Sequence, residues 1–353
     1  MRRLLFLIPL VLAIAAVHLL CAWTGTLYYL TQMTMSAYYS LLVIGLCVVM
    51  GYAGQISLGH AGFFAIGGYL AAAFTTRNLA GLQDALPVRM LDAAGLLVSG
   101  RDVYGGAQLV VTPWAACVAA VLAAALIALL IGIPVLKLKG HYLAMATLGF
   151  GIIIYKIALA VPYFGGADGI SEVPPFNLLP GLAITGGSAN RIANYYIAWT
   201  LVLLGVTLLW NLIHSRVGRA LRAIHGSERA ADSIGVDTAR YKLYTFMLSA
   251  VFAALAGVFL THYNGGIGPS EAGVMKSVRY VAIVAVGGMA HIWGALVMGT
   301  LLNFLSLRGV FGTYDDAVFG AILILIMLFA PEGILQTGIM DRLRRLVSRR
   351  EED

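Results

Sequence analysis

Long apolar runs separated by short polar segments fill most of this 353-residue chain. The runs lack the strict alternation of barrel strands, and most are long enough to cross a bilayer as helices. The pattern predicts an all-α, polytopic membrane bundle of about ten transmembrane segments, some of them broken or re-entrant. The predicted spans are 4–23, 35–52, 55–75, 112–136, 142–161, 193–213, 242–263, 277–289, 292–307 and 314–331.

Basic residues decide the number of spans, because Lys and Arg gather in cytoplasmic loops. With the N-terminus in the cytoplasm, every basic cluster falls inside only if 35–75 and 277–307 each count as two spans. Re-entrant segments would give the same parity. Both termini are then cytoplasmic, and the long loops 76–111 and 162–192 lie outside. The basic clusters are Arg2 and Arg3, Lys137 and Lys139, and the segments 214–242 and 342–350.

Composition excludes a soluble protein, since 60% of the residues are hydrophobic, only 11% are charged and the mean hydropathy is +0.89. Soluble domains carry roughly 25% charged residues. The net charge of +7 could suggest a nucleic-acid partner, but the basic residues lie where cytoplasmic loops are expected. We predict a bilayer partner, no nucleic acid, one membrane domain over 1–340 and a charged cytoplasmic tail over 341–353.

Residues 51–70, GYAGQISLGHAGFFAIGGYL, combine an apolar run with polar side chains and six glycines. Both features are costly inside a bilayer unless they serve a cavity or a helix break. A second glycine-interrupted region, 281–299, lies in the other half of the chain, an arrangement typical of transport sites. The predicted substrate-pathway residues are Gln55, Ser57, Gly59, His60 and Phe63.

Three of these pathway residues also have a structural alternative, and Gln55 is expected to line the cavity. Ser57 is expected to cap the helix that follows the break, directing its positive end towards a carboxylate. His60 could contact substrate or form a hydrogen bond between helices, and the sequence does not separate the two. A phenylalanine such as Phe63 more often packs in the core than forms the wall of a substrate site. Elsewhere, Arg279 near a helix end is expected to snorkel to the interface.

The predicted cytoplasmic segment 214–242 has the pattern of two short helices. Arg216, Arg219 and Arg222 recur along one side of the first. Ser227 suits the N-cap of the second, and Gly235 suits its C-terminal stop. Such an element could lie on lipid or insert into a partner protein.

Several stretches resemble a known family. RAADSIG (229–235) resembles the Glu-Ala-Ala-x-x-x-Gly loop that docks ABC importer permeases onto their ATPases, with Arg229 in place of Glu. Residues 51–69 resemble the Gly-x-x-Gly-x-x-Ser-Leu-Gly-His-Ala-x-Phe segment of branched-chain amino acid importer permeases of the LivM type. Further blocks of that family are matched, in order, by 138–150, 164–170, 287–299 and 329–335, with Phe164, Ala290 and Ala295 departing from its pattern.

The resemblance implies a subunit of a bacterial inner-membrane importer for branched-chain amino acids, or a related small amide or acid such as urea. It implies a second homologous permease, expected as a heterodimer, two ABC ATPase subunits and a periplasmic substrate-binding protein. The implied ATPase-coupling residues are Arg219, Arg222, Glu228, Arg229, Ala230, Ala231 and Gly235. The implied external gate or binding-protein contact consists of Gly165, Gly166, Asp168 and Gly169.

Energy must come from outside this chain. None of its five lysines follows a glycine, so the Gly-Lys pair of a Walker A loop is absent. We therefore expect ATP to be bound by partner subunits, and no cofactor in this chain. No convincing catalytic or metal-ligand cluster is visible, which argues against an enzyme. The alternatives are an ion-gradient-driven secondary transporter of small amino acids and a non-transporting scaffold.

Overall fold

The computed structural model describes the chain except for residues 1–6, 102–106, 139, 180 and 330–353. The predicted tail 341–353 and most of the block 329–335 therefore lie outside the described residues. Each of the ten predicted spans coincides with an α-helix. These helices are α1 (Ile8–Trp23), α2 (Tyr29–Cys47), α3 (His60–Thr76), α5 (Pro113–Val135), α6 (His141–Ala160), α7 (Arg191–Ile213), α10 (Thr238–Asn264), α11 (Val274–Gly287), α12 (Ile292–Leu307) and α13 (Asp315–Phe329).

The described helices confirm a polytopic helical membrane protein. Five helical segments are long and apolar enough to cross a membrane: Tyr29–Tyr52, Pro113–Val135, His141–Ala160, Ser188–Ile213 and Thr238–Asn264. α1 and α12 are apolar but shorter. The predicted division of 277–307 is confirmed, because α11 ends at Gly287 and α12 begins at Ile292.

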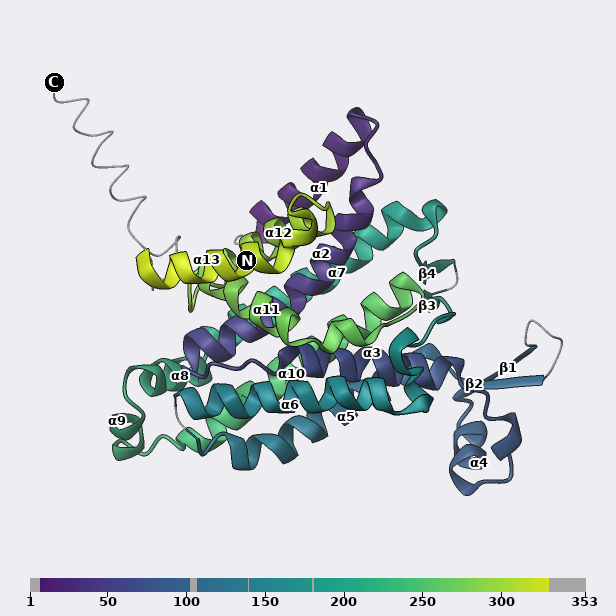
Figure 1. The fold of residues 1–353 in the computed structure, drawn as a ribbon, viewed down its shortest axis with the longest axis horizontal. Coiled ribbons are helices and arrows are strands. Elements are labelled where there is room, and N and C mark those ends of the chain that lie inside the picture. The colour runs from purple at the N-terminus through teal and green to yellow at the C-terminus, as the bar shows by residue number, and fades with distance from the viewer. Residues whose placement is uncertain (1–6, 102–106, 139, 180, 330–353) are drawn as a thin grey trace.

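The two ends of the bundle carry different secondary-structure elements (Figure 1). One end carries α8 (Arg216–Gly226) and α9 (Glu228–Ser233), which form the predicted docking segment. The opposite end carries α4 (Leu86–Ala93) and two antiparallel hairpins that the sequence did not predict, in the two loops expected outside. The hairpins pair β1 (Leu97–Arg101) with β2 (Ala107–Val111), and β3 (Phe176–Leu179) with β4 (Leu182–Ile184).

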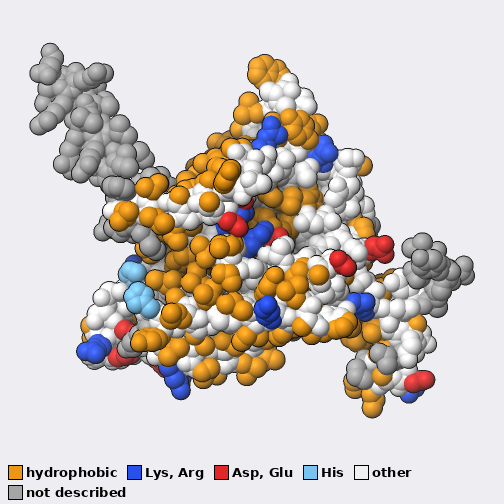
Figure 2. Space-filling view, in the orientation of Figure 1, with side chains coloured by type: hydrophobic (Ala, Val, Ile, Leu, Met, Phe, Trp, Pro, Cys, Tyr) orange, Lys and Arg blue, Asp and Glu red, His pale blue; other side chains and the backbone are white. Residues whose placement is uncertain are grey.

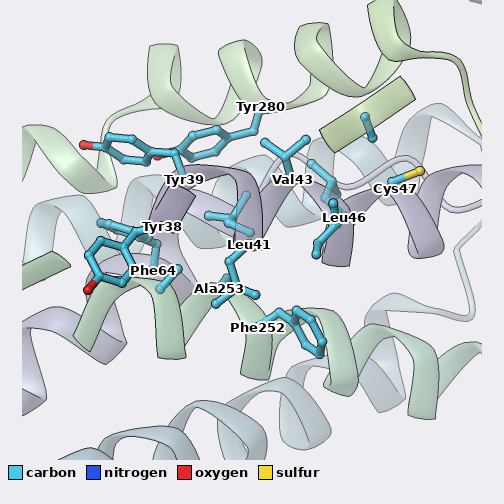
Figure 3. Packing of buried hydrophobic residues seen from close by; sticks show 14 of the residues in the cluster. Tyr38, Tyr39, Leu41, Val43, Leu46, Cys47, Phe64, Phe252, Ala253 and Tyr280 are labelled. Atoms are coloured by element: carbon cyan, nitrogen blue, oxygen red, sulfur yellow. The ribbon is translucent and has the colours of Figure 1, made fainter. Parts of the chain in front are cut away.

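The core is built around α2, α3 and α10, and small residues let these helices approach closely. A Cβ atom on Gly67 of α3 would lie 2.2 Å from the carbonyl oxygen of Ala254 on α10. A Cβ on Gly257 of α10 would likewise lie 2.0 Å from the carbonyl oxygen of Phe64. Close backbone approach of this kind drives helix association where lipid supplies no hydrophobic force. Figure 3 shows the buried side chains of this centre, among them Phe64, Phe252 and Ala253.

The outer helices expose apolar side chains instead. In the most apolar 18 residues of each helix, only 33% of the residues of α5 and 28% of those of α6 are buried. The corresponding share for Tyr29–Tyr52, which is α2 with its π-helical extension, is 89%. Hydrophobic side chains dominate the face drawn in Figure 2. A lipid-facing surface accounts for this exposure, because hydrocarbon solvates such side chains at no cost.

Candidate functional site

Two helix breaks from opposite halves of the chain meet inside the bundle. α2 ends in a π-helical turn (Val48–Tyr52), and an irregular segment over 53–59 leads to α3. The second break separates α11 from α12 at residues 288–291. The Tyr52 hydroxyl donates a 2.7 Å hydrogen bond to the Ala290 carbonyl oxygen, and a Cβ on Gly51 would lie 1.9 Å from the Ala290 nitrogen. The pairing of broken segments suggested by the sequence is therefore a direct contact.

The second break is itself organised by side-chain capping. Ala290 adopts a positive φ of 65°, a conformation that residues other than glycine rarely take. The next residue, His291, caps α12 by accepting a 3.1 Å hydrogen bond from the backbone N–H of Gly294. Backbone strain of this sort persists only where the surroundings fix it, and it gathers at functional sites.

His60 links three parts of the bundle through its ring. Its Nδ1 lies 3.0 Å from the Ser57 hydroxyl, and its Nε2 lies 2.7 Å from the hydroxyl of Ser249 on α10. The expectation that Ser57 caps the following helix is wrong. α3 begins at His60 with Gly59 in the N-cap position and no side-chain cap, because the Ser57 hydroxyl faces the imidazole instead. Both imidazole nitrogens thus have partners inside the protein.

Gly59 and Phe63 pack the start of α3 against its neighbours. A Cβ on Gly59 would lie 2.7 Å from the Thr147 carbonyl oxygen of α6. Phe63 is fully buried, with its ring centre 4.8 Å from that of Phe150 and 5.6 Å from that of Phe246. Their part in a substrate pathway stays a prediction, and their immediate surroundings are those of packed core residues.

Gln55 differs from the other four predicted pathway residues. Its side chain is buried, yet neither atom of its amide group has a hydrogen-bond partner among the described residues. Next to it, Gly54 adopts a φ of 65°, and a Cβ there would lie 3.1 Å from Nδ1 of His225, at the end of α8. The first break therefore touches the docking segment on one side and the second break on the other.

The docking segment has the predicted local structure. The Ser227 hydroxyl caps α9 by accepting a 3.3 Å hydrogen bond from the backbone N–H of Ala230. Gly235, with φ of 84°, follows the end of that helix, and Lys242 of α10 forms a 2.7 Å ion pair with Glu228. Of the predicted coupling residues, Arg219, Arg222, Arg229, Ala230 and Gly235 are exposed, Glu228 is half-buried and Ala231 is buried.

At the opposite end, the glycine-rich loop needs its glycines. Gly165, Gly166 and Gly169 have φ of 81°, 59° and 72°. A Cβ on Gly169 would lie 2.2 Å from the Ile267 carbonyl oxygen. Ile170 and Ile267 exchange backbone hydrogen bonds of 2.9 and 2.8 Å, which fasten this loop to the α10–α11 connection. The exposed Asp168 borders a polar cavity of about 590 Å³.

Two charged clusters were not predicted from the sequence. Arg279 does not snorkel, because it pairs with Asp315 and Asp316 and donates a 2.8 Å hydrogen bond to the Ser306 hydroxyl. The other cluster joins Tyr39, Glu271 and Lys276. A signal existed, since these charges interrupt or border apolar runs. Within the described residues, no three His, Cys, Asp or Glu side chains gather to hold a metal ion.

A family model described as the permease component of branched-chain amino acid transport systems matches residues 28–327. The chain belongs to this permease family. This permease is 30% identical to the high-affinity branched-chain amino acid transport system permease protein LivM of Escherichia coli, over 95% of this chain and 75% of that protein. The resemblance read from the sequence motifs is thereby confirmed.

The permease is also similar to a second group of relatives. It is 29% identical to the permease protein LivH of Salmonella typhimurium, over 88% of this chain and 96% of that protein. It is likewise 29% identical to BraD of Pseudomonas aeruginosa, over 87% of this chain and 96% of that protein. No solved structure matches. Membership of a family of transport permeases disfavours the ion-gradient-driven alternative and the scaffold.

Proposed function

We propose that this chain is a membrane-spanning subunit of an ABC importer for branched-chain amino acids. It would lie in the bacterial inner membrane with both termini in the cytoplasm, and ATP would be bound by separate ATPase subunits. The observation that carries the proposal is the exposed α8–α9 segment, which lies at the end of the bundle opposite the external hairpins and touches the first helix break.

The surface of α9 suits insertion into a partner. Ile234, just beyond α9, is 76% exposed, and the exposed Arg229 lies on the same short element. A large apolar side chain beside a charged one is typical of a small protein–protein contact. The ion pair between Glu228 and Lys242 fastens α9 to α10, so that movement of an ATPase subunit would reach the core helices.

The external face would meet the substrate-binding protein. The glycine-rich loop containing Asp168 and the polar cavity beside it lie at the end that carries the β-hairpins. We place the external gate there, with Gly165, Gly166 and Gly169 setting its backbone. The single domain over 1–340 would pair with a second, homologous permease, and similarity to both LivM and LivH supports a heterodimer.

Among the predicted pathway residues, we assign the substrate-facing role to Gln55, whose amide lacks partners among the described residues. Ser57, Gly59, His60 and Phe63 would hold the break in shape. This division follows from hydrogen bonding, because a buried amide without partners is destabilising unless something else satisfies it.

Uptake of labelled leucine into vesicles containing all the subunits tests the proposal. We expect uptake to require ATP inside the vesicle and to resist a protonophore at constant ATP. Uptake that persists without the ATPase subunits would overturn it.

Deletion of 226–236 should leave the permease in the membrane but unable to co-purify with an ATPase subunit. The Lys156→Gln variant, which changes an exposed side chain on α6, is the control and should co-purify as the wild type does.

A further inference from the structure

A charged pair lies close to the external loop, between α10 and α11. Glu271 belongs to a single 3-10 turn (Pro269–Ala272), and Lys276 lies in the first turn of α11. The Lys276 Nζ and the Glu271 Oε1 are 3.0 Å apart, and the two side chains are only 24% and 20% exposed. Charges that are largely withdrawn from solvent in a membrane protein are costly and point to a function.

Tyrosine side chains surround this pair. The Tyr39 hydroxyl lies 3.2 Å from both carboxylate oxygens of Glu271, and the Lys276 Nζ lies 3.4 Å from the same hydroxyl. The Tyr280 ring centre lies 6.1 Å from that of Tyr39, and Tyr69 belongs to the same buried cluster as Ile267 and Ala272, the residue after Glu271. Figure 3 shows Tyr39 and Tyr280 side by side with their rings pointing in the same direction. We call Tyr39, Tyr69, Glu271, Lys276 and Tyr280 the outer cluster.

Two members of the outer cluster are left with unused hydrogen-bonding capacity. The hydroxyls of Tyr69 and Tyr280 are buried, and neither has a hydrogen-bond partner among the described residues. A purely structural ion pair would not need the hydroxyls of Tyr69 and Tyr280, because the Tyr39 hydroxyl already donates a hydrogen bond to the Glu271 carboxylate. Buried hydroxyls without partners are destabilising, so their presence beside a charged pair indicates a ligand that supplies the missing bonds.

The outer cluster also lies next to the loop that we assign to the external gate. The 3-10 turn that carries Glu271 begins two residues after Ile267, and the backbone bonds between Ile170 and Ile267 fasten this connection to the external glycine-rich loop. The Phe64 ring stacks on Tyr39, with 5.7 Å between the ring centres. A solute released at the external gate would meet charge, hydroxyls and apolar rings together.

We propose that the outer cluster is a binding site for a zwitterionic amino acid. The substrate carboxylate binds Lys276 and the free tyrosine hydroxyls, its ammonium group binds Glu271, and its aliphatic side chain packs on the rings. Binding replaces the internal ion pair by two ion pairs with the substrate, so the charges stay balanced at every stage. The inference rests on the proposed import function and adds the residues that bind the two charges of the substrate.

The test uses the purified complete transporter in detergent, without the binding protein, and three probes at millimolar concentration. Leucine carries both charges, isocaproate only the carboxylate and isoamylamine only the ammonium. The readout is the shift of the thermal unfolding midpoint. We expect all three to stabilise the wild type. Glu271→Gln should abolish the response to isoamylamine and retain that to isocaproate, and Lys276→Gln should do the reverse.

Matched variants separate this site from a structural lock. Lys156→Gln should respond as the wild type does. Tyr280→Phe removes one hydroxyl, keeps the ring, and should weaken the apparent affinity for isocaproate about tenfold. The proposal is overturned if no probe stabilises the wild type, or if the Glu271 and Lys276 variants lose stability without any change in which probe they recognise.

Failure of this inference and failure of the proposed function remain distinguishable. If vesicles with wild-type permease show no ATP-dependent leucine uptake, the import function itself fails. If the wild type imports leucine and the Glu271→Gln, Lys276→Gln and Tyr280→Phe variants import it equally fast, only the binding site fails. We expect each charge variant to slow uptake at least about tenfold.

Discussion

The hydroxyl of Tyr52 and the carbonyl oxygen of Ala290, separated by 238 positions in the chain, are joined by a 2.7 Å hydrogen bond. The bond connects the end of the π-helical turn after α2 to the residue with positive φ before α12. No side chain separates the two backbones here, since Gly51 packs directly on Ala290. The two breaks therefore form one joint whose geometry depends on the absence of a single methyl group.

Gly51→Ala should disrupt this joint. The new Cβ would lie 1.9 Å from a backbone nitrogen that cannot rotate away, so the helices must separate, at a cost of about 3 kcal/mol or more. We expect a lower thermal unfolding midpoint in detergent and loss of transport. Gly149→Ala on α6 is the control, because nothing lies within 4 Å of that Cβ and alanine favours helix by up to about 1 kcal/mol. Equal behaviour of the two variants would contradict the contact.

The bond between His60 and Ser249 can be measured by a double-mutant cycle. Each single alanine substitution leaves a buried polar partner unsatisfied, which should lower the free energy of unfolding by about 1–3 kcal/mol. The double variant should lose less than the sum, with a coupling energy of about 0.5–3 kcal/mol. If both single variants fold but only His60→Ala stops transport, His60 acts on substrate and the structural assignment is wrong.

The two carboxylates that face Arg279 should differ in importance. Asp315 is 24% exposed and also accepts a 2.6 Å hydrogen bond from the Ser306 hydroxyl, whereas Asp316 is 57% exposed. Asp315→Asn weakens a largely buried pair and should cost about 3 kcal/mol in unfolding free energy. Asp316→Asn should cost less than about 1 kcal/mol, because solvent screens an exposed pair. Denaturant titration of the two variants in the same detergent checks the order.

Local changes in α9 should weaken ATPase binding without unfolding the permease. Ser227→Ala removes the helix cap and Gly235→Ala introduces a side chain at φ of 84°, each costing about 1 kcal/mol locally. We expect the pair of substitutions to reduce co-purification with the ATPase subunits while the unfolding midpoint of the bundle stays unchanged. Ser233→Ala is the control, because that hydroxyl only donates to the Arg229 carbonyl oxygen within α9.

Most of the helical framework could be predicted from the sequence, because it depends on local rules. Apolar length located the helices, and the division of 277–307 expected from the basic residues is confirmed. Serine and glycine chemistry located α9, since Ser227 and Gly235 act on their own neighbours. The two β-hairpins escaped prediction because their strands are short and lie in loops whose composition resembles that of a connector.

The candidate site was harder to predict, because its contacts join distant segments. The sequence showed that Ser57 and His60 are polar residues in an apolar run, but not that they bind each other and Ser249, 189 positions after His60. A capping serine was the local expectation, and a long-range network replaced it. The prediction that Arg279 snorkels was wrong for the same reason, because its carboxylate partners lie at the start of a helix that begins 36 positions later.

α10 connects the docking segment, His60 and the outer cluster. It holds the docking segment at its start through Lys242, meets His60 through Ser249 midway, and ends beside the loop that carries the outer cluster. Its 27 residues extend over about 40 Å. Coupling between two binding sites is thermodynamically reciprocal. If binding of an ATPase subunit changes the affinity of the proposed outer cluster for an amino acid by some factor, the bound amino acid must change the affinity for the ATPase subunit by the same factor.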